Sequence, residues 1–214
     1  MTSVMGMVKL DFLTVKSQSK LFLILAAITA YFAMMGSSFP ILCATCSWFA
    51  VLMAANVFIS QEKNGLERLY STLSLRPGGV VLGRYLFMLC THLFSLAVLV
   101  VFYCGIGLIR HMALDLQEIV FGFCLSLLFF CLIEGIQLPL FFKMGYAKAK
   151  LWSLLPFIAV MGLLALPVFS DAFQNVAEFM EDSRGTFSAL CLLASALVLL
   201  VSYACSVAAY RKKR

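Results

Sequence analysis

The chain has 214 residues, of which 63% are hydrophobic and only 12% are charged. A soluble globular domain has about half of its residues apolar and about a quarter charged, so the composition excludes such a domain and indicates a membrane protein. The net charge of +6 comes from basic residues dispersed among loop ends. This dispersal favours contact with anionic membrane lipid and argues against a nucleic-acid partner.

The N-terminal segment, residues 1–20, is amphipathic. Apolar residues such as Val8 and Leu10 alternate loosely with Lys9 and Asp11. The pattern is compatible with a helix that lies along the inner membrane surface. Lysines before the first apolar run and alanines within it also fit a secretory signal peptide, an alternative that we disfavour.

Six apolar runs follow along the chain. Each is compatible with a segment of about 20 residues that crosses a bilayer core of about 30 Å. The runs occupy residues 21–35, 41–60, 85–109, 119–142, 151–170 and 187–210. We therefore predict an all-α, polytopic membrane protein that forms a single domain over residues 1–214.

The distribution of basic residues predicts the orientation of these spans. If both termini are cytoplasmic, every Lys and Arg except Arg110 and Arg184 lies on the cytoplasmic side or at its edge, and most acidic residues lie outside. Cytoplasmic loops retain positive charge during insertion. We therefore expect both termini in the cytoplasm.

The longest polar segment, residues 61–84, separates the second and third runs. Within it Leu66, Leu69, Tyr70 and Leu73 recur at helical spacing, charged side chains occupy the other face, and a Pro-Gly-Gly sequence ends the pattern. This predicts a cytoplasmic amphipathic helix of about three turns. The pattern leaves open whether the helix docks a partner or merely connects two spans.

The loop between the fifth and sixth runs carries a second helical pattern. Phe173, Val176, Phe179 and Met180 recur at helical spacing among acidic and amide residues. We expect a short helix here on the extracellular side.

The apolar runs contain one carboxylate, Glu134, together with the polar residues His92 and Gln137. At 1.5 Å per residue, Glu134 lies about 13 Å from Lys143, and His92 lies about 12 Å from Arg84 in the neighbouring antiparallel span. These matched depths suggest that His92 and Glu134 meet inside the bundle, with Gln137 on the same helix face. The pair either fixes packing or takes part in transport, and an intramembrane enzyme that uses both as acid and base is a more remote alternative.

Motifs for nucleotide or peptide chemistry are absent from the sequence. There is no phosphate-binding G-x-x-x-x-G-K-[ST], no H-E-x-x-H and no G-x-S-x-G. Cys43 and Cys46 form a C-x-x-C, but neither a second pair nor a nearby His completes a metal site. We therefore predict no catalytic residues, no metal site and no cofactor bound by this chain.

Three patches of the sequence carry a family likeness. They are KLDFLTVKSQSK before the first run, EKNGLERLYSTLSLRPGGVVLGRYL after the second, and LPLFFKMGYAKAK at the inner end of the fourth. With them the chain resembles the small six-span permeases of the bacterial type-2 ABC transporter family.

This resemblance implies a non-catalytic permease subunit in the bacterial cell membrane. It would pair with a second permease, identical or different, and with cytosolic ABC ATPase subunits that bind ATP and magnesium. The cytoplasmic helix would then be a coupling helix that enters a groove of the ATPase, through Glu62, Leu66, Glu67, Arg68, Leu69, Tyr70 and Leu73. The resemblance favours export of a peptide, lipid-like or other amphipathic substrate.

A non-transporting membrane scaffold or sensor subunit is the alternative function. Such a protein would bind its partner through the same cytoplasmic helix without moving a substrate. The sequence leaves the substrate, the direction of transport and the identity of the second permease open.

Overall fold

The computed structural model describes residues 2–16, 19–65, 77–110, 115–169 and 183–213. Within these ranges every regular element is an α-helix, as predicted from the apolar runs. The helices are α1 (Thr2–Lys16), α2 (Ser19–Met34), α3 (Phe39–Lys63), α5 (Pro77–Arg110), α6 (Leu116–Met144), α7 (Tyr146–Phe169) and α9 (Arg184–Lys213).

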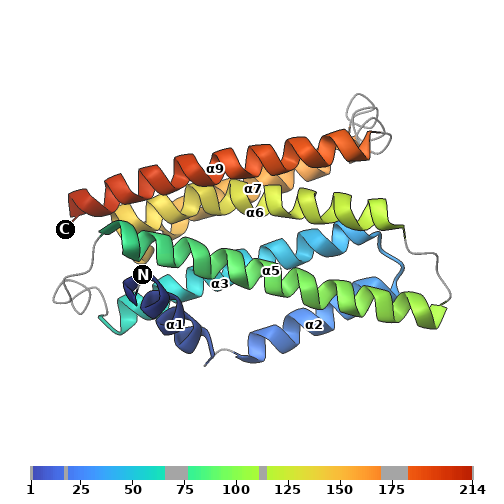
Figure 1. Ribbon diagram of the computed structural model, residues 1–214, viewed down its shortest axis with the longest axis horizontal. Helices are drawn as coiled ribbons and strands as arrows, with labels where there is room; N and C mark the ends of the chain where they lie inside the picture. The colour runs from blue at the N-terminus through green and yellow to red at the C-terminus, as the bar shows by residue number, and fades with distance from the viewer. Residues whose placement is uncertain (1, 17–18, 66–76, 111–114, 170–182, 214) are drawn as a thin grey trace.

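The long helices run lengthwise beside one another as a bundle (Figure 1). Both termini lie at one end of it, together with the end of α3 and the start of α5, and we call this the termini end (Figure 1). The turn from α2 to α3 and the start of α6 lie at the opposite end. The short helix α1 packs against α5 and α3 at the termini end.

Four helices among the described residues are long and apolar enough to cross a membrane. They cover Phe39–Lys63, Pro77–Ile109, Leu116–Met144 and Arg184–Lys212. The first and fifth predicted runs lie in α2, which has 16 residues, and in α7, which has 24. The extracellular helix predicted around residues 173–180 lies outside the described residues.

The centre of the bundle is α6, which packs against α3, α7 and α9. Its glycines permit close approach of the neighbouring helices. A Cβ atom added at Gly135 would lie 2.7 Å from Cγ1 of Val198 on α9, and one at Gly122 would lie 2.8 Å from Cδ1 of Phe39 on α3. Small residues at such contacts are a common means of packing helices within a membrane, where the helices gain little from apolar burial.

Aromatic side chains fill the core towards the termini end. Phe58 of α3 contacts Phe141 and Phe142 of α6, with ring centres 5.0 and 5.4 Å apart. Phe142 in turn contacts Tyr210 of α9, with ring centres 5.5 Å apart. Such tilted and edge-on contacts add to the burial of apolar surface, so these rings join three helices at this level.

Buried hydroxyl groups link helices at two further points. Ser47 of α3 and Ser126 of α6 share a hydrogen bond of 2.6 Å between their Oγ atoms. The Tyr85 hydroxyl of α5 lies 2.5 Å from Ser202 Oγ and 2.8 Å from Ser206 Oγ on α9. In an apolar environment such bonds hold helices in register, because the alternative is an unsatisfied polar group.

Carboxylates cap helix starts at the opposite end of the bundle. The Asp115 side chain accepts a hydrogen bond of 2.9 Å from Gln117 N at the start of α6. Glu118 Oε1 accepts one of 3.1 Å from Phe39 N, so it caps the start of a different helix, α3. Both caps satisfy backbone N–H groups that have no partner within their own helix.

Candidate functional site

A buried arginine joins three helices at the termini end. The Nε atom of Arg84 on α5 lies 3.0 Å from Oδ2 of Asp11 on α1, and both side chains are only 1% exposed. The Nη2 group of Arg84 donates a hydrogen bond of 2.6 Å to Oε1 of Gln61 on α3. Its Cζ atom lies 4.9 Å from the ring centre of Phe58, also on α3, as in a cation–π contact. We call Asp11, Phe58, Gln61 and Arg84 the Arg84 cluster.

The Arg84 cluster lies beside the two helix ends that flank the predicted coupling segment. These are the end of α3 and the start of α5, and we call them the stems. Gln61 belongs to the last turn of α3, which ends at Lys63. Arg84 is about two turns into α5, which begins at Pro77, a residue well suited to the first position of a helix. The hydrogen bond between Gln61 and Arg84 therefore ties the two stems together, and the ion pair ties them to α1.

Burial changes the pKa of the acidic residue in this cluster. It raises the pKa of Asp11 from 3.8 to about 6, although the positive charge of Arg84 opposes the rise. Because the pKa is higher in the folded chain than in the unfolded chain, the Asp11 contribution to stability is present below pH 3.8 and is lost as the pH rises through about 6. Near neutral pH, Asp11 is therefore mostly charged and depends on Arg84 as its counter-ion.

Glu62 connects the end of α3 to a fourth helix. Its Oε2 atom accepts a hydrogen bond of 3.0 Å from Ala147 N in the first turn of α7. The turn from α6 into α7 is possible because Gly145 has a φ of 76°, a value that favours glycine. Glu62, predicted as an ATPase contact, thus caps α7, while its side chain remains exposed at the surface.

The other predicted coupling residues lie outside the described residues. They are Leu66, Glu67, Arg68, Leu69, Tyr70 and Leu73. The amphipathic helix that they form in our sequence analysis therefore stays a prediction. What the structure adds is the arrangement of the two stems that hold it.

The three intramembrane polar residues are all buried in the bundle. His92 of α5 stacks on Phe130 of α6, with ring centres 4.4 Å apart and planes at 4°. Gln137 donates a hydrogen bond of 2.8 Å from Nε2 to the Ser153 carbonyl of α7. Among the described residues, no hydrogen bond joins His92 to Glu134, and neither side chain has a hydrogen-bond partner. The proposed meeting of this pair stays a prediction.

The stacking contact nevertheless places His92 on the Glu134 side of α6. Phe130 and Glu134 are four residues apart and share a helix face. His92 thus packs against α6 one turn from Glu134, whereas Gln137 links the same helix to α7. The matched depths gave no indication of the ring contact between His92 and Phe130.

The Arg84 cluster was missed in the sequence analysis, which placed Arg84 among the loop ends. One signal was available in the chain. Asp11 is the only acidic residue in the first 61 residues, and it lies among apolar residues of the N-terminal segment. A lone carboxylate of that kind needs a partner, and Arg84 is a basic residue at the same predicted end.

The fold and site define an α-helical membrane protein with two tethered stems at the termini end. A family model described as ABC-2 family transporter protein matches residues 6–211, nearly the whole chain. The chain therefore belongs to the ABC-2 transporter family, as its sequence resemblance indicated. No curated protein and no solved structure matches it. Membership makes it a membrane component of a transporter and implies association with ABC ATPase partners.

Proposed function

We propose that this chain is the permease subunit of an ATP-driven exporter. Separate cytosolic ATPase subunits would bind ATP and magnesium and hydrolyse the nucleotide, while this chain provides the path across the membrane. Its membership of the ABC-2 transporter family supports the role, and its sequence contains no phosphate-binding loop of its own. The proposed cargo is a peptide, a lipid-like molecule or another amphipathic compound.

The coupling role is supported by the contacts that attach both stems to neighbouring helices. Arg84 links α5 to α3 and α1, and Glu62 links the end of α3 to α7. A helix pushed by an ATPase passes its movement on only if its two ends are attached to the elements that must move. In this proposal the segment between Lys63 and Pro77 receives the force, and these contacts distribute it to four helices.

The proposed topology has six spans, with α2 and α7 as the first and the fifth. Both termini and the coupling segment would face the cytoplasm of a bacterial cell, with α1 along the inner membrane surface. In this topology every Lys and Arg except Arg110 and Arg184 falls on the cytoplasmic side or at its edge, which supports the orientation. Exposed apolar side chains on α2, such as Ile28 and Phe32, support its contact with lipid. A second permease, identical or different, would complete the pathway.

Co-purification tests the coupling role. Replacing Leu66, Leu69 and Leu73 together by serine is expected to abolish co-elution with the cognate ABC ATPase, because the apolar anchors of the predicted helix are lost. The amount of ATPase recovered per permease in affinity purification measures this.

The matched control replaces three leucines that are exposed on α9, far from the stems. The variant Leu190→Ser, Leu193→Ser, Leu197→Ser removes the same number of leucine side chains and is expected to retain the ATPase. Undiminished ATPase recovery with the residue 66, 69 and 73 variant would overturn the proposed coupling surface.

For the intramembrane polar residues we propose a packing role. Glu134→Gln is expected to leave stability and ATP-dependent transport nearly unchanged, since the His92 stacking and the Gln137 bond do not use a charge at position 134. Melting temperature and nucleotide turnover of the assembled complex measure this. As the control, Gln137→Glu deletes the Nε2 donor and adds a buried carboxyl, so it is expected to destabilise the bundle. Loss of transport by normally expressed Glu134→Gln would instead support a transport role.

A further inference from the structure

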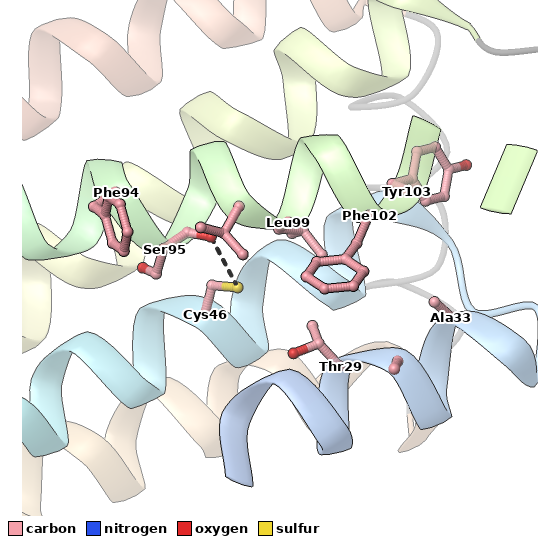
Figure 2. Close-up of a pocket in the computed structure, with 10 residues that line it drawn as sticks. Thr29, Ala33, Cys46, Phe94, Ser95, Leu99, Phe102 and Tyr103 are labelled. Atoms are coloured by element: carbon pink, nitrogen blue, oxygen red, sulfur yellow. Dashed lines mark hydrogen bonds between the residues drawn. The ribbon is translucent and has the colours of Figure 1, made fainter. Parts of the chain in front are cut away.

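A cavity of about 120 Å³ lies between α2, α3 and α5. Figure 2 shows Thr29 on α2 and Phe102 on α5 pointing toward each other across it, with Cys46 of α3 to one side. Ala33 of α2 and Leu99 of α5 also line the wall. The cavity thus lies between α2 and the two helices that α2 packs against.

The lining of the cavity contains few polar groups that could bind a polar ligand. The Cys46 thiol lies 3.9 Å from the Ser95 carbonyl and donates to it (Figure 2). Ser95 Oγ donates a hydrogen bond of 2.8 Å to the His92 carbonyl. These groups are therefore engaged within the protein, and the remaining wall consists mainly of alanine, valine, leucine and aromatic side chains. The chemistry of the wall selects an apolar ligand.

The cavity opens towards the exposed surface of α5, from which a flexible apolar chain can enter. A second, more open hollow of about 230 Å³ lies beside it at the same level of α5 and is lined by Ala97, Val98, Val101 and Phe102. The two share Val98 and Phe102, so together they form an apolar path from the surface of α5 towards the space between α2, α3 and α5. Its rim is open, because Phe94 is 62% and Phe102 50% exposed on a helix long enough to span a membrane.

We propose that this path binds one acyl chain of a membrane lipid between α2, α3 and α5. An apolar cavity of about 150 Å³ stays free of water and accepts small apolar molecules. The cavity between α2, α3 and α5, of about 120 Å³, is close to that size and has room for a segment of an alkyl chain. At this level of the bundle the surrounding solvent is hydrocarbon, and an entering chain restores dispersion contacts that the lining otherwise lacks. The bound lipid would join α2 to the bundle. The inference does not depend on the proposed coupling to an ATPase.

Photo-crosslinking in a defined bilayer tests this site. The full chain is placed in nanodiscs of phosphatidylcholine in which a fraction of the lipid carries a diazirine within one acyl chain. After irradiation, mass spectrometry maps the adducts. Adducts are expected at least five times more often around Cys46, Leu99 and Phe102 than around Leu193 and Leu197, which are exposed on α9.

A cavity-filling variant separates a bound chain from ordinary surrounding lipid. Ala30→Phe adds a ring from the α2 wall and is expected to lower cavity adducts at least five-fold, with α9 adducts unchanged. Val98→Phe fills the same space from α5 and serves as the second variant should the first not elute as a folded protein. The matched control, Leu193→Phe, changes a lipid-facing residue and leaves cavity adducts intact. Equal adduct density on the cavity and on α9, or cavity adducts that persist in a folded filled variant, would overturn the proposal.

Discussion

Replacing Arg84 by alanine is expected to lower the free energy of unfolding by about 3–5 kcal/mol, the usual range for breaking a buried ion pair at one partner. The substitution leaves the carboxylate of Asp11, which is 1% exposed, without its counter-ion. It also removes the hydrogen bond between Arg84 and Gln61. Thermal unfolding of the purified protein in detergent at pH 7 measures the loss. Because the opposing charge of Arg84 is gone, the variant is also expected to regain stability as the pH is lowered from 7 to 5.

The chain contains a matched control for this prediction. Arg184 pairs with Asp115 at a similar distance, 3.1 Å, but the two side chains are 30% and 52% exposed. Arg184→Ala is therefore expected to change stability by no more than about 1 kcal/mol. If the two alanine variants unfold alike, burial does not govern the Arg84 pair and the cluster does not brace the stems.

The second large effect is expected at Gly135, where α6 lies in close contact with α9. Gly135→Leu would place a Cβ atom 2.7 Å from Val198 Cγ1, and its remaining atoms need space that the contact does not have. Overpacking of this kind destabilises by about 1–3 kcal/mol, occasionally more, because neighbouring side chains and backbone must shift. Unfolding temperature and the monodispersity of the purified variant measure the effect.

Two further variants separate crowding from a general effect of losing glycine. Gly105→Ala on α5 meets no atom within 4 Å and is expected to be neutral or slightly stabilising, since alanine favours a helix. Adding Val198→Ala to the Gly135 variant removes the nearest atom and is expected to recover part of the lost stability. A fully stable Gly135→Leu protein would show that α6 and α9 are not in close contact.

The coarse fold could be predicted from the sequence because a membrane imposes simple conditions on a chain. Long apolar runs predict helices, and the helices from α2 to α9 each contain most of one run, although α5 begins at Pro77, eight residues before its run. Boundaries were less predictable. The second run was expected to end near residue 60, but α3 continues to Lys63, so Gln61 and Glu62 are presented from a helix and can bind Arg84 and Ala147.

The candidate site was predicted in part. Matched depth suggested that His92 and Glu134 meet, which stays a prediction, but it gave no indication that His92 stacks on Phe130. Depth along a helix follows from the rise per residue, but the direction of a side chain depends on the rotation of each helix about its axis. Rotation is decided by packing against neighbours, which a single periodic pattern does not specify.

By itself the sequence determined that this protein is a helical membrane protein and that it lacks a phosphate-binding motif. It also determined that three segments resemble the family to which the chain belongs. These properties are local or additive, so composition and short patterns contain them. Only the tertiary structure decided that Asp11, Gln61 and Arg84 converge and that a cavity opens beside Cys46. Both depend on how separate helices approach one another, and that follows from the balance of packing and buried charge over the whole bundle.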